Sequence, residues 1–389
     1  MERIVVIGSG QGGVQAAISL RQEGYTGKLT VIGAESGLPY QRPPLSKAFL
    51  KSGDADALRL RPAAFYEKNN IDLVDGTRVE WIDRANRVVH AGASAFGYDH
   101  LILATGTRNL RPPIPGAELA LDLRTLEDAV RLRAALAAPR RCAVIGGGFI
   151  GLEFAAVARS LGHAVTVAEA APRLMARVVS PEMSARFLAL HEAMGTSVRL
   201  ADPAVAISED GIMLAGGDRI EADLILMAAG VVPNTELAQG AGLAVENGVV
   251  VDCRLVTEDP AISALGDCCA FPDPVTDRLV RLESVQAATD HARLIARRLV
   301  RGERASYAAV PWFWSDQSDH KLQIAGLSSA ADGAIVRGDG ATFRFCGERI
   351  SAVETVNDAK THMQARKRLA ISPIFVRDLE AAGLDLGAL

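Results

Sequence analysis

The 389-residue sequence has few cysteines and no long apolar segment. Its cysteines are Cys142, Cys253, Cys268, Cys269 and Cys346, and no two are spaced as C-x-x-C or C-x-x-x-x-C. The spacing therefore offers neither a metal-binding knuckle nor a redox dithiol, and the adjacent pair predicts two buried thiols. No run approaches the roughly 18 apolar residues of a membrane span. A strand is predicted almost at the N-terminus, with no room for a signal peptide, so we expect a cytoplasmic protein.

The sequence also lacks a strong charge of either sign. Its formal net charge of −4 argues against nucleic acid as the main partner. Hydrophobic residues make up 49% of the chain and charged residues 23%, which is ordinary for a globular enzyme with a large core. The length predicts two or three domains of roughly 150 residues each.

A glycine motif of the form G-x-G-x-x-G occurs twice, in similar surroundings. Each copy follows an apolar run, opens an Ala-rich helical stretch and is followed by an acidic residue, Glu35 or Glu169, after a second apolar run. The glycines are Gly8, Gly10, Gly12 and Gly13 in GSGQGG and Gly146, Gly148 and Gly151 in GGGFIG. Such a turn lets a pyrophosphate approach the backbone at a helix N-terminus, and the carboxylate binds ribose hydroxyls. Two dinucleotide sites in one chain indicate a redox flavoprotein.

The chain divides into four segments, 1–108, 109–235, 236–307 and 308–389, and a stiff Pro-rich stretch at 111–116 marks the first boundary. The strands expected between the motifs and in the tail lie at 71–74, 77–82, 87–90, 101–104, 224–228, 321–325, 334–336, 342–345 and 351–356. Helices are expected at 125–138 and 358–370. The doubled motif is the only internal repeat, and it predicts two related α/β units.

Longer motifs resemble the putidaredoxin-reductase and biphenyl-dioxygenase ferredoxin-reductase group, a branch of the glutathione-reductase type of flavoprotein. They are PYQRPPLSK (39–47), ATGTR (104–108), LRTLEDA (123–129), GGGFIGLEFAA (146–156), GVVPN (230–234), LGDC (265–268), LESVQAATDHA (282–292) and PWFWSDQ (311–317). The resemblance implies an α/β fold with two Rossmann-like dinucleotide-binding domains and a C-terminal α+β domain. Segments 1–108 and 236–307 would bind FAD, segment 109–235 would bind NADH, and 308–389 would form the C-terminal domain.

The resemblance also implies which residues bind FAD. Glu35 would hold the adenosine ribose, Asp267 the ribityl chain, and Val285 the pyrimidine end of the flavin, where a helix dipole stabilises negative charge. The other FAD positions are the first set of glycines with Arg42, Lys47, Val79, Ala104, Thr105, Arg124 and Trp314, and Val79 is expected in a strand.

For the nicotinamide cofactor the resemblance implies a second set of residues. They are Gly146, Gly148, Ile150, Gly151, Glu153, Glu169, Arg177 and Gly230. A carboxylate at Glu169 favours NADH over NADPH because it repels a 2′-phosphate, although Arg173 and Arg177 could soften this preference. Lys47 and Glu153 would form an ion pair beside the flavin and, with Trp314, make up the catalytic set.

Disulphide reductases of this superfamily carry a C-x-x-x-x-C pair where this sequence has residues 43–47, so electrons must leave the flavin by another route. The resemblance implies hydride transfer from NADH to FAD, followed by single-electron transfer to a [2Fe–2S] ferredoxin that feeds an oxygenase. The alternatives are a rubredoxin reductase, an NADH oxidase, or a redox-sensing flavoprotein similar to apoptosis-inducing factor. We expect a monomer or weak dimer.

A basic stripe could steer an acidic ferredoxin. Arg293, Arg297, Arg301 and Arg304 are spaced to share one face of a predicted helix. The alternative is an ordinary solvated helix face.

Overall fold

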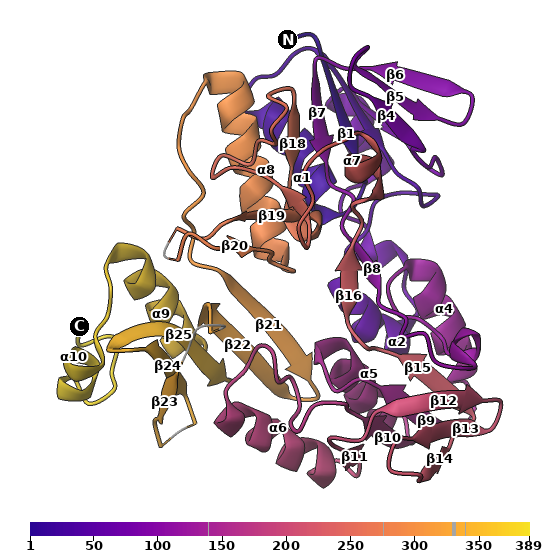
Figure 1. The fold of residues 1–389 in the computed structure, drawn as a ribbon, viewed down its shortest axis with the longest axis vertical. Coiled ribbons are helices and arrows are strands. Elements are labelled where there is room, and N and C mark those ends of the chain that lie inside the picture. Colours follow the sequence, from indigo (N-terminus) through magenta and orange to yellow (C-terminus); the bar gives the residue numbers. More distant parts are fainter. Residues whose placement is uncertain (139, 275, 329–331, 339) are drawn as a thin grey trace. The chain divides into compact units, whose positions relative to one another are not determined.

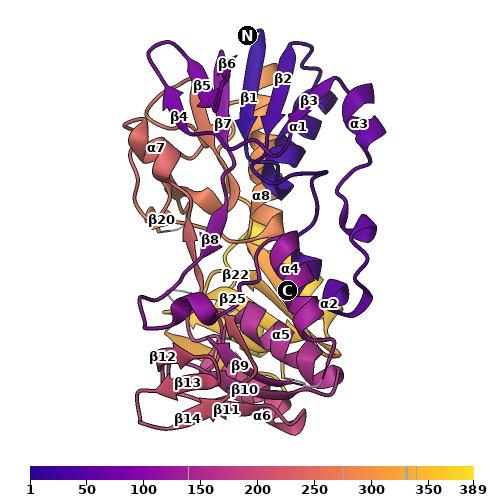
Figure 2. The same ribbon diagram turned by 90° about the vertical axis from the view of Figure 1, so that its right-hand side faces the viewer.

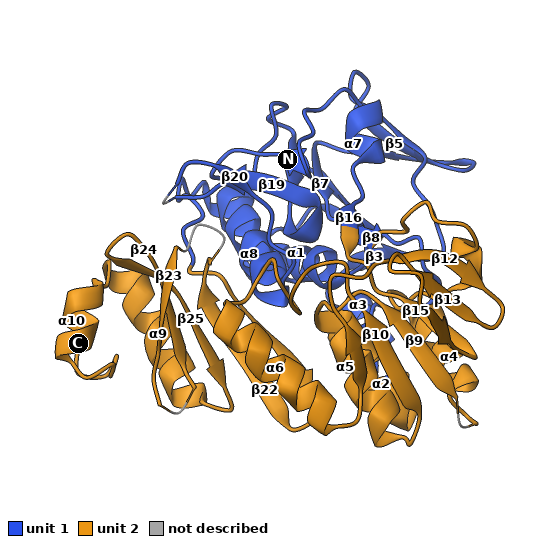
Figure 3. Cartoon of the chain, turned by 60° about the horizontal axis from the view of Figure 1, so that its bottom comes forward, with its two compact units in different colours: residues 1–41, 56–108, 232–309 blue, residues 42–55, 109–231, 310–389 orange. Residues whose placement is uncertain are grey.

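The computed structural model describes residues 1–138, 140–274, 276–328, 332–338 and 340–389. The chain divides into two compact units, each assembled from three separate segments (Figure 3). Unit 1 contains residues 1–41, 56–108 and 232–309, and unit 2 contains residues 42–55, 109–231 and 310–389. The segment 42–55 thus belongs to unit 2, although the segments on either side of it in the sequence belong to unit 1. The assignment of the predicted segments to separate FAD, NADH and C-terminal domains stays a prediction.

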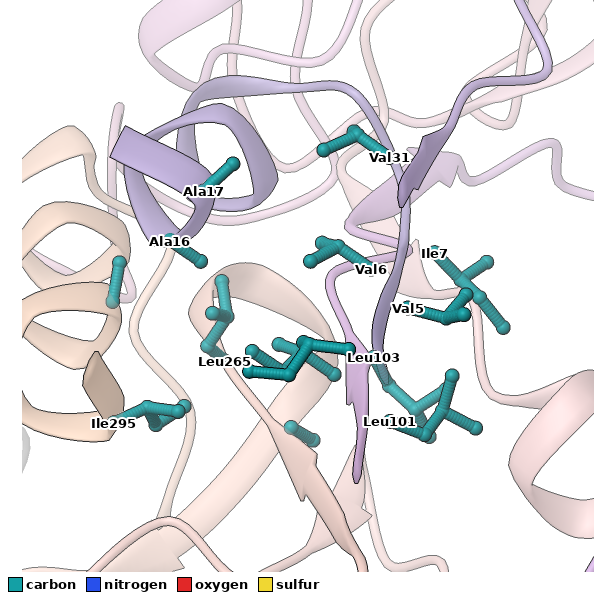
Figure 4. Close-up of a cluster of buried hydrophobic side chains, with 14 of the residues drawn as sticks. Val5, Val6, Ile7, Ala16, Ala17, Val31, Leu101, Leu103, Leu265 and Ile295 are labelled. Carbon is teal, nitrogen blue, oxygen red and sulfur yellow. The ribbon is translucent and has the colours of Figure 1, made fainter. Parts of the chain in front are cut away.

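Unit 1 is built on a five-stranded parallel sheet in the order β18-β7-β1-β2-β3. Figure 1 labels β18, β7 and β1 of this sheet, and Figure 2 labels β2 and β3. Its strands are β1 (Arg3–Ile7), β2 (Lys28–Ile32), β3 (Ile71–Val74), β7 (His100–Leu103) and β18 (Ile262–Ala264). Most residues of these strands are apolar because a parallel sheet is covered on both faces. Helices α1 (Gln11–Gln22) and α8 (Val285–Arg301) pack against each other, and Ala16 and Ala17 of α1 and Ile295 of α8 lie in the core drawn in Figure 4.

An antiparallel three-stranded sheet completes the first half of unit 1. It contains β4 (Trp81–Asp83), β5 (Val88–Ala91) and β6 (Ser94–Gly97). The sequence predicted a strand from 77 to 82, but pairing begins only at Trp81, so Val79 lies in the connection before the strand. The expectation that Val79 is a strand residue was wrong. Its side chain is nevertheless buried.

Unit 2 repeats the parallel arrangement in a four-stranded sheet ordered β11-β10-β9-β15. Its strands are β9 (Arg141–Ile145), β10 (Ala164–Ala168), β11 (Ser197–Arg199) and β15 (Leu224–Met227), and its helices are α4 (Leu126–Ala135), α5 (Phe149–Ser160) and α6 (Pro181–Ala193). Helix α4 is shorter than the predicted 125–138: it starts after a capping box formed by Thr125 and Asp128, and it ends at Ala135 with Leu136 as its C-cap. Figure 2 shows the small antiparallel sheet of β12 (Ala204–Ser208), β13 (Gly211–Leu214) and β14 (Arg219–Glu221).

The C-terminal part of unit 2 is an antiparallel sheet with two helices (Figure 1). The sheet runs in the order β21-β22-β25-β24-β23, formed by β21 (Trp312–Gln317), β22 (His320–Gly326), β23 (Gly333–Val336), β24 (Thr342–Cys346) and β25 (Arg349–Val356). Helix α9 (Ala359–Ile371) packs on β22 and β25, and α10 (Val376–Ala381) follows it. The four strands and the helix expected in this tail are present, each within two residues of its predicted ends. Strand β21 and helix α10 were not predicted.

The remaining elements are short helices and strands, and these strands pair in two further small sheets. They are β8 (Thr107–Asn109), β16 (Val231–Pro233), β17 (Val249–Val250), β19 (Cys269–Pro272), β20 (Leu279–Val280), α2 (Ala48–Ser52), α3 (Ala63–Lys68), α7 (Glu236–Gly240) and short 3₁₀ turns at Pro43–Ser46, Asp56–Leu58, Ala117–Leu119 and Gly266–Cys268. The two parallel sheets and the C-terminal α+β part confirm the predicted fold class. No helix in the described ranges is long and apolar enough to span a membrane.

Candidate active site

Both glycine motifs form the turn between a parallel strand and the helix that follows it. Gly8 lies after β1 and Gly146 after β9, and each has a φ of +111°, a backbone conformation that L-residues with a side chain rarely adopt. A Cβ built on Gly8 would lie 2.1 Å from the carbonyl oxygen of Ala104, and one built on Gly146 would lie 2.3 Å from that of Ala228. The first glycine of each motif is therefore required by the turn itself.

The later glycines of each motif fall into two groups, those that close packing requires and those that face open space. A Cβ on Gly13 would lie 1.8 Å from the oxygen of Gly8, so this glycine, like its counterpart Gly151, is needed for the helix to approach the strand. Gly12 is also a packing position, because its Cβ would meet the Leu265 side chain at 2.4 Å. A Cβ on Gly10 or Gly148, in contrast, would have no described protein atom within 4 Å.

The open space at Gly10 and Gly148 lies at a helix N-terminus in both units. Each of these residues is the N-cap of its helix, α1 or α5, and neither helix has a side-chain cap or an acidic residue in its first turn. The first backbone N–H groups of both helices thus lack a side-chain acceptor, which is how a helix receives a phosphate. The residues present fit a dinucleotide pyrophosphate at each turn.

The acidic residue after each motif also lies at the carboxyl end of its sheet. Glu35 follows β2, and its Oε2 accepts a hydrogen bond from the hydroxyl of Tyr40. Glu169 follows β10, and its two oxygens accept backbone N–H groups of Gly147 at 2.5 Å and Ala171 at 2.7 Å. The Glu169 carboxylate is thereby fixed against the glycine turn of its own unit.

Several predicted FAD residues gather at the carboxyl end of the unit 1 sheet, where open α/β sheets bind ligands. Ala104 and Thr105 follow β7, and Thr105 exchanges two hydrogen bonds with Asn234, at 2.6 and 2.8 Å. Asp267 follows β18 and accepts a bond from the Thr107 hydroxyl at 3.3 Å. Val285 is the first residue of α8, as predicted.

A buried ion pair lies in unit 2. The Lys47 ammonium is 3.1 Å from Oε1 of Glu153, a side chain that is only 4% exposed on α5. The hydroxyl of Ser46 donates to Glu153 Oε2 at 2.5 Å, and that of Ser315 donates to Oε1 at 2.7 Å. Burial raises the pKa of Glu153, and the Lys47 charge and the two hydroxyls oppose this. The expected ion pair is present, and the hydroxyls around it are an addition that the sequence did not reveal.

An aromatic ring lies near this pair, and two arginines of unit 2 contact each other. The Lys47 ammonium lies 5.8 Å from the centre of the Trp314 ring, and the Trp314 and Trp312 rings are 5.8 Å apart. The guanidinium of Arg42 donates to the backbone carbonyl of Arg124 at 2.7 Å. The structure thus brings Arg42 and Arg124, two predicted FAD positions, together within one unit.

The remaining residues expected at the nicotinamide cofactor lie around the second glycine turn. Ile150 is exposed in the first turn of α5, and Arg177 is an exposed side chain close to Gly230. Arg173, which could soften the preference for NADH, donates its guanidinium to the carbonyls of Val179 and Ala176 and to a serine hydroxyl. This local network makes Arg173 a structural residue of the loop before α6.

Sequence reasoning missed a buried polar chain that extends from Glu153. Ser315 accepts a bond from Gln317 at 3.2 Å, and Gln317 accepts one from His191 of α6 at 2.8 Å. All three of these side chains are buried. Ser315 and Gln317 belong to the PWFWSDQ motif, but the sequence did not predict that this motif forms strand β21. Only the alternation of side chains along that strand shows that these two residues point into the interior.

The predicted arginine stripe is only partly correct. Helix α8 ends at Arg301 with Gly302 as a left-handed C-cap, so Arg304 lies beyond the helix. The three helical arginines each have an acidic neighbour within unit 1: Arg293 with Asp290 at 3.5 Å, Arg297 with Glu303 at 3.1 Å, and Arg301 with Glu23. The stripe is therefore less positive than its sequence suggests.

The cysteines form no bond with one another. Each of the five is a free thiol, and Cys268 and Cys269 are fully buried, as predicted. Among the described residues no group of histidine, cysteine, aspartate or glutamate is arranged to hold a metal ion.

Residues 2–292 match the family described as pyridine nucleotide-disulphide oxidoreductase, and residues 312–378 match the one described as reductase C-terminal. The chain belongs to the pyridine nucleotide-disulphide oxidoreductase family. Rhodocoxin reductase of Rhodococcus erythropolis is 49% identical over 381 residues, covering 94% of this chain and 89% of that relative. A rubredoxin-NAD(+) reductase of Ectopseudomonas oleovorans is 40% identical over 368 residues, covering 91% and 95%. The crystal structure of a covalent putidaredoxin reductase–putidaredoxin complex matches with a TM-score of 0.95 at 37% identity, covering 99% of this chain and 97% of that one.

This member of the pyridine nucleotide-disulphide oxidoreductase family is an NAD(P)H-dependent flavoprotein reductase that uses FAD. The predicted resemblance to the putidaredoxin-reductase group is confirmed by the relatives and by the matching solved structures. The names of these relatives, rhodocoxin reductase and rubredoxin-NAD(+) reductase, say what those proteins reduce.

Proposed function

We propose that this reductase takes hydride from NADH and delivers single electrons to a [2Fe–2S] ferredoxin that feeds an oxygenase. The observation that carries the proposal is the Lys47–Glu153 pair, whose lysine ends the loop 43–47. A disulphide reductase needs two thiols at that position of the sequence, whereas this loop has none. Without a dithiol in this loop, the electrons would pass from the flavin to an acceptor outside the protein, and we propose that this acceptor is a carrier protein. The carriers in the names of the relatives, rhodocoxin and rubredoxin, support this proposal.

The FAD would be held mainly by unit 1. The turn at Gly10 would receive the pyrophosphate, Glu35 the adenosine ribose, Asp267 the ribityl chain and Val285 the pyrimidine end of the flavin. The other residues proposed to contact FAD are Gly8, Gly12, Gly13, Arg42, Lys47, Val79, Ala104, Thr105, Arg124 and Trp314. When bound, FAD supplies the chemistry, because it accepts a hydride and can release electrons one at a time.

The nicotinamide cofactor would be held by the second glycine turn of unit 2. The N-terminus of α5 at Gly148 would receive its pyrophosphate, and Glu169 would bind its ribose hydroxyls and reject NADPH. Arg177 and Ile150 are exposed beside this turn, and Gly230 lies close to Arg177. These residues would complete the binding surface together with Gly146 and Gly151.

The ion pair would hold a negative charge at a fixed place in a buried environment. Glu153 accepts three hydrogen bonds from Lys47, Ser46 and Ser315, so its carboxylate cannot rotate without breaking them. A buried pair adds little net stability, because desolvation offsets the attraction of the charges. Its proposed role is therefore electrostatic: Lys47 and Glu153, with Trp314, would set the environment of the reacting flavin and nicotinamide.

The ferredoxin is proposed to dock partly on the arginine stripe of α8, defined as Arg293, Arg297 and Arg301, with Arg304 beyond the helix end. The Arg293 side chain is 55% exposed, and its acidic neighbour is 3.5 Å away, so it retains the capacity to attract an acidic partner. For Arg293→Glu we expect ferredoxin reduction to slow about threefold to tenfold at low salt, with the difference disappearing at high salt. Lys28→Glu, at the start of β2, is the charge-matched control. An Arg293 variant with unchanged salt dependence would rule out this surface.

The function is tested by anaerobic stopped-flow spectroscopy of the holoenzyme. Mixing with NADH should bleach the flavin rapidly, and a second mix with a [2Fe–2S] ferredoxin should reduce the ferredoxin rapidly. A protein that is slowly bleached by NADH and reduces no carrier contradicts the proposal. Rapid transfer to rubredoxin, with little to ferredoxin, would favour the rubredoxin alternative that one relative's name supports. The cytoplasmic location and the monomer or weak-dimer state stay predictions.

A further inference from the structure

Strand β21 of unit 2 presents three consecutive polar side chains, and they do not share one environment. Ser315 and Gln317 are fully buried, whereas Asp316, between them, is about one-third exposed. This alternation is the two-residue period of a strand. Asp316 therefore points away from the buried polar chain of its two neighbours, yet it still contacts the ion pair through Lys47.

The Lys47 ammonium lies between two carboxylates. Its nitrogen is 3.1 Å from Glu153 and 3.4 Å from Asp316. The two acids are therefore close enough to repel each other, and the lysine shares its charge between them. Asp316 also forms an ion pair with a second lysine. Lys321 lies directly opposite it on β22, and the Lys321 ammonium is 3.5 Å from the other carboxylate oxygen of Asp316.

Asp316 and Lys321 also line a solvent-facing cavity of about 540 Å³ in unit 2. Its other lining residues include Asp319, Gln323 and Asn357. Glu153 is almost fully buried, Lys47 is 18% exposed, and Lys321 is more than half exposed. The four charges thus form a row from the interior to the solvent: Glu153, Lys47, Asp316 and Lys321.

We propose that Asp316 is a positioning residue that divides the charge of Lys47 between itself and Glu153, and that Lys321 controls this division from the cavity. The proposal concerns the same Lys47–Glu153 pair as the proposed function. It rests on that function only for the use that the protein makes of the pair in electron transfer. The ionisation of the buried Glu153 is thus expected to respond to Asp316, which contacts Lys47, and to Lys321, which contacts Asp316, and not to every charge on the cavity wall.

The ionisation of Glu153 depends on the groups that contact it or its partner Lys47. From its neighbours, it meets the Lys47 ammonium and the Ser46 hydroxyl of the preceding loop and the Ser315 hydroxyl of β21. Asp316 is the further charged group that contacts Lys47. Removing the Asp316 charge leaves Lys47 wholly to Glu153 and removes a nearby negative charge, so Glu153 should ionise more easily. When the Lys321 charge is removed, Asp316 interacts more strongly with Lys47, its remaining cation. Lys47 then stabilises the Glu153 carboxylate less, so Glu153 should ionise less easily.

The test measures the ionisation of Glu153 in the oxidised holoenzyme, with no NADH or ferredoxin present. Infrared spectra recorded across a pH titration detect the carbonyl stretch of a protonated buried carboxyl group, and loss of the band in Glu153→Gln assigns it. We expect Asp316→Asn to lower the midpoint of this band by on the order of one pH unit and Lys321→Gln to raise it. Asp316→Glu, which restores the charge, should return the midpoint towards that of the natural protein.

Asp319→Asn is the matched control, because it removes the same charge from the same cavity wall, but Asp319 pairs with His320 and not with Lys47. It should leave the midpoint unchanged. Equal midpoints in Asp316→Asn and the natural protein would overturn the proposal, as would shifts of the same sign in the Asp316 and Lys321 variants. If Asp316→Asn does not fold, Lys321→Gln, at an exposed position, decides by itself. A failed electron-transfer assay with opposite midpoint shifts would contradict the proposed function and leave this inference standing.

Discussion

At the scale of single residues, Glu169 has two uses for one carboxylate. It accepts the backbone N–H groups of Gly147 and Ala171, so it stabilises the glycine turn before any cofactor binds. The same charge would repel a 2′-phosphate. A side chain that keeps the hydrogen bonds but loses the charge separates these two uses.

We predict that Glu169→Gln keeps the turn and weakens the preference for NADH. The amide oxygen can still accept one backbone N–H, whereas the repulsion of the 2′-phosphate is lost. The ratio of kcat/KM for NADH to that for NADPH should fall about tenfold, which corresponds to about 1.4 kcal/mol. Steady-state kinetics of flavin reduction with both cofactors measures the ratio. Glu182→Gln, an exposed acid on α6, is the control, and an unchanged ratio in Glu169→Gln would show that the carboxylate is structural only.

At the scale of elements, the two strand–turn–helix units use their glycines in parallel ways. The first glycine is demanded by its positive φ and the last by the approach of helix to strand, whereas Gly10 and Gly148 face open space. The middle position is therefore the one at which a small side chain interferes with a ligand and not with folding.

We predict that Gly148→Ala folds normally and retains FAD but binds NADH at least tenfold more weakly. Gly148 has an extended backbone (φ −84°, ψ −176°), which alanine adopts without strain, but the added methyl group would occupy the space proposed for the pyrophosphate. The Kd for NADH comes from the concentration dependence of flavin reduction. Gly240→Ala, where the built Cβ also meets nothing, is the matched control. A Gly148 variant with normal NADH binding would mean that the cofactor does not approach this turn.

The sequence was sufficient for these elements because their signals are local. Strand β3 was predicted with its exact ends, since three apolar residues in four and a following turn define it. The glycine turns follow from a six-residue motif. The surroundings of Glu153 could not be predicted, because Ser46 and Ser315 lie 107 and 162 residues away from it in the chain. The arginine stripe was overextended for a related reason: the αL cap at Gly302 ends α8 before Arg304.

At the scale of the whole molecule, both units bury neutral histidines. Burial lowers the pKa of His100 and His291 in unit 1, each to about 3, and lowers that of His191 and His362 in unit 2. His291 shows why the neutral form is needed: its Nδ1 accepts the backbone N–H of Gly266, next to Asp267, and its ring lies edge-on to Phe271 and Tyr307. A protonated Nδ1 could not accept that bond.

These histidines predict that the protein loses stability in mild acid. The folded state binds fewer protons than the unfolded state, in which a histidine has a pKa near 6.5, so stability is lost as the pH falls from about 6.5 towards 3. At pH 5 the cost is about 2 kcal/mol for His291 alone. For His291→Gln we expect lower stability at pH 7 but a fall between pH 7 and pH 5 that is smaller by about this amount. Urea unfolding followed by flavin fluorescence, at a fixed excess of FAD, measures both values. His90→Gln, a partly exposed histidine of unit 1, should retain the full pH dependence, and an equally steep fall in both variants would mean that His291 is protonated in the folded protein.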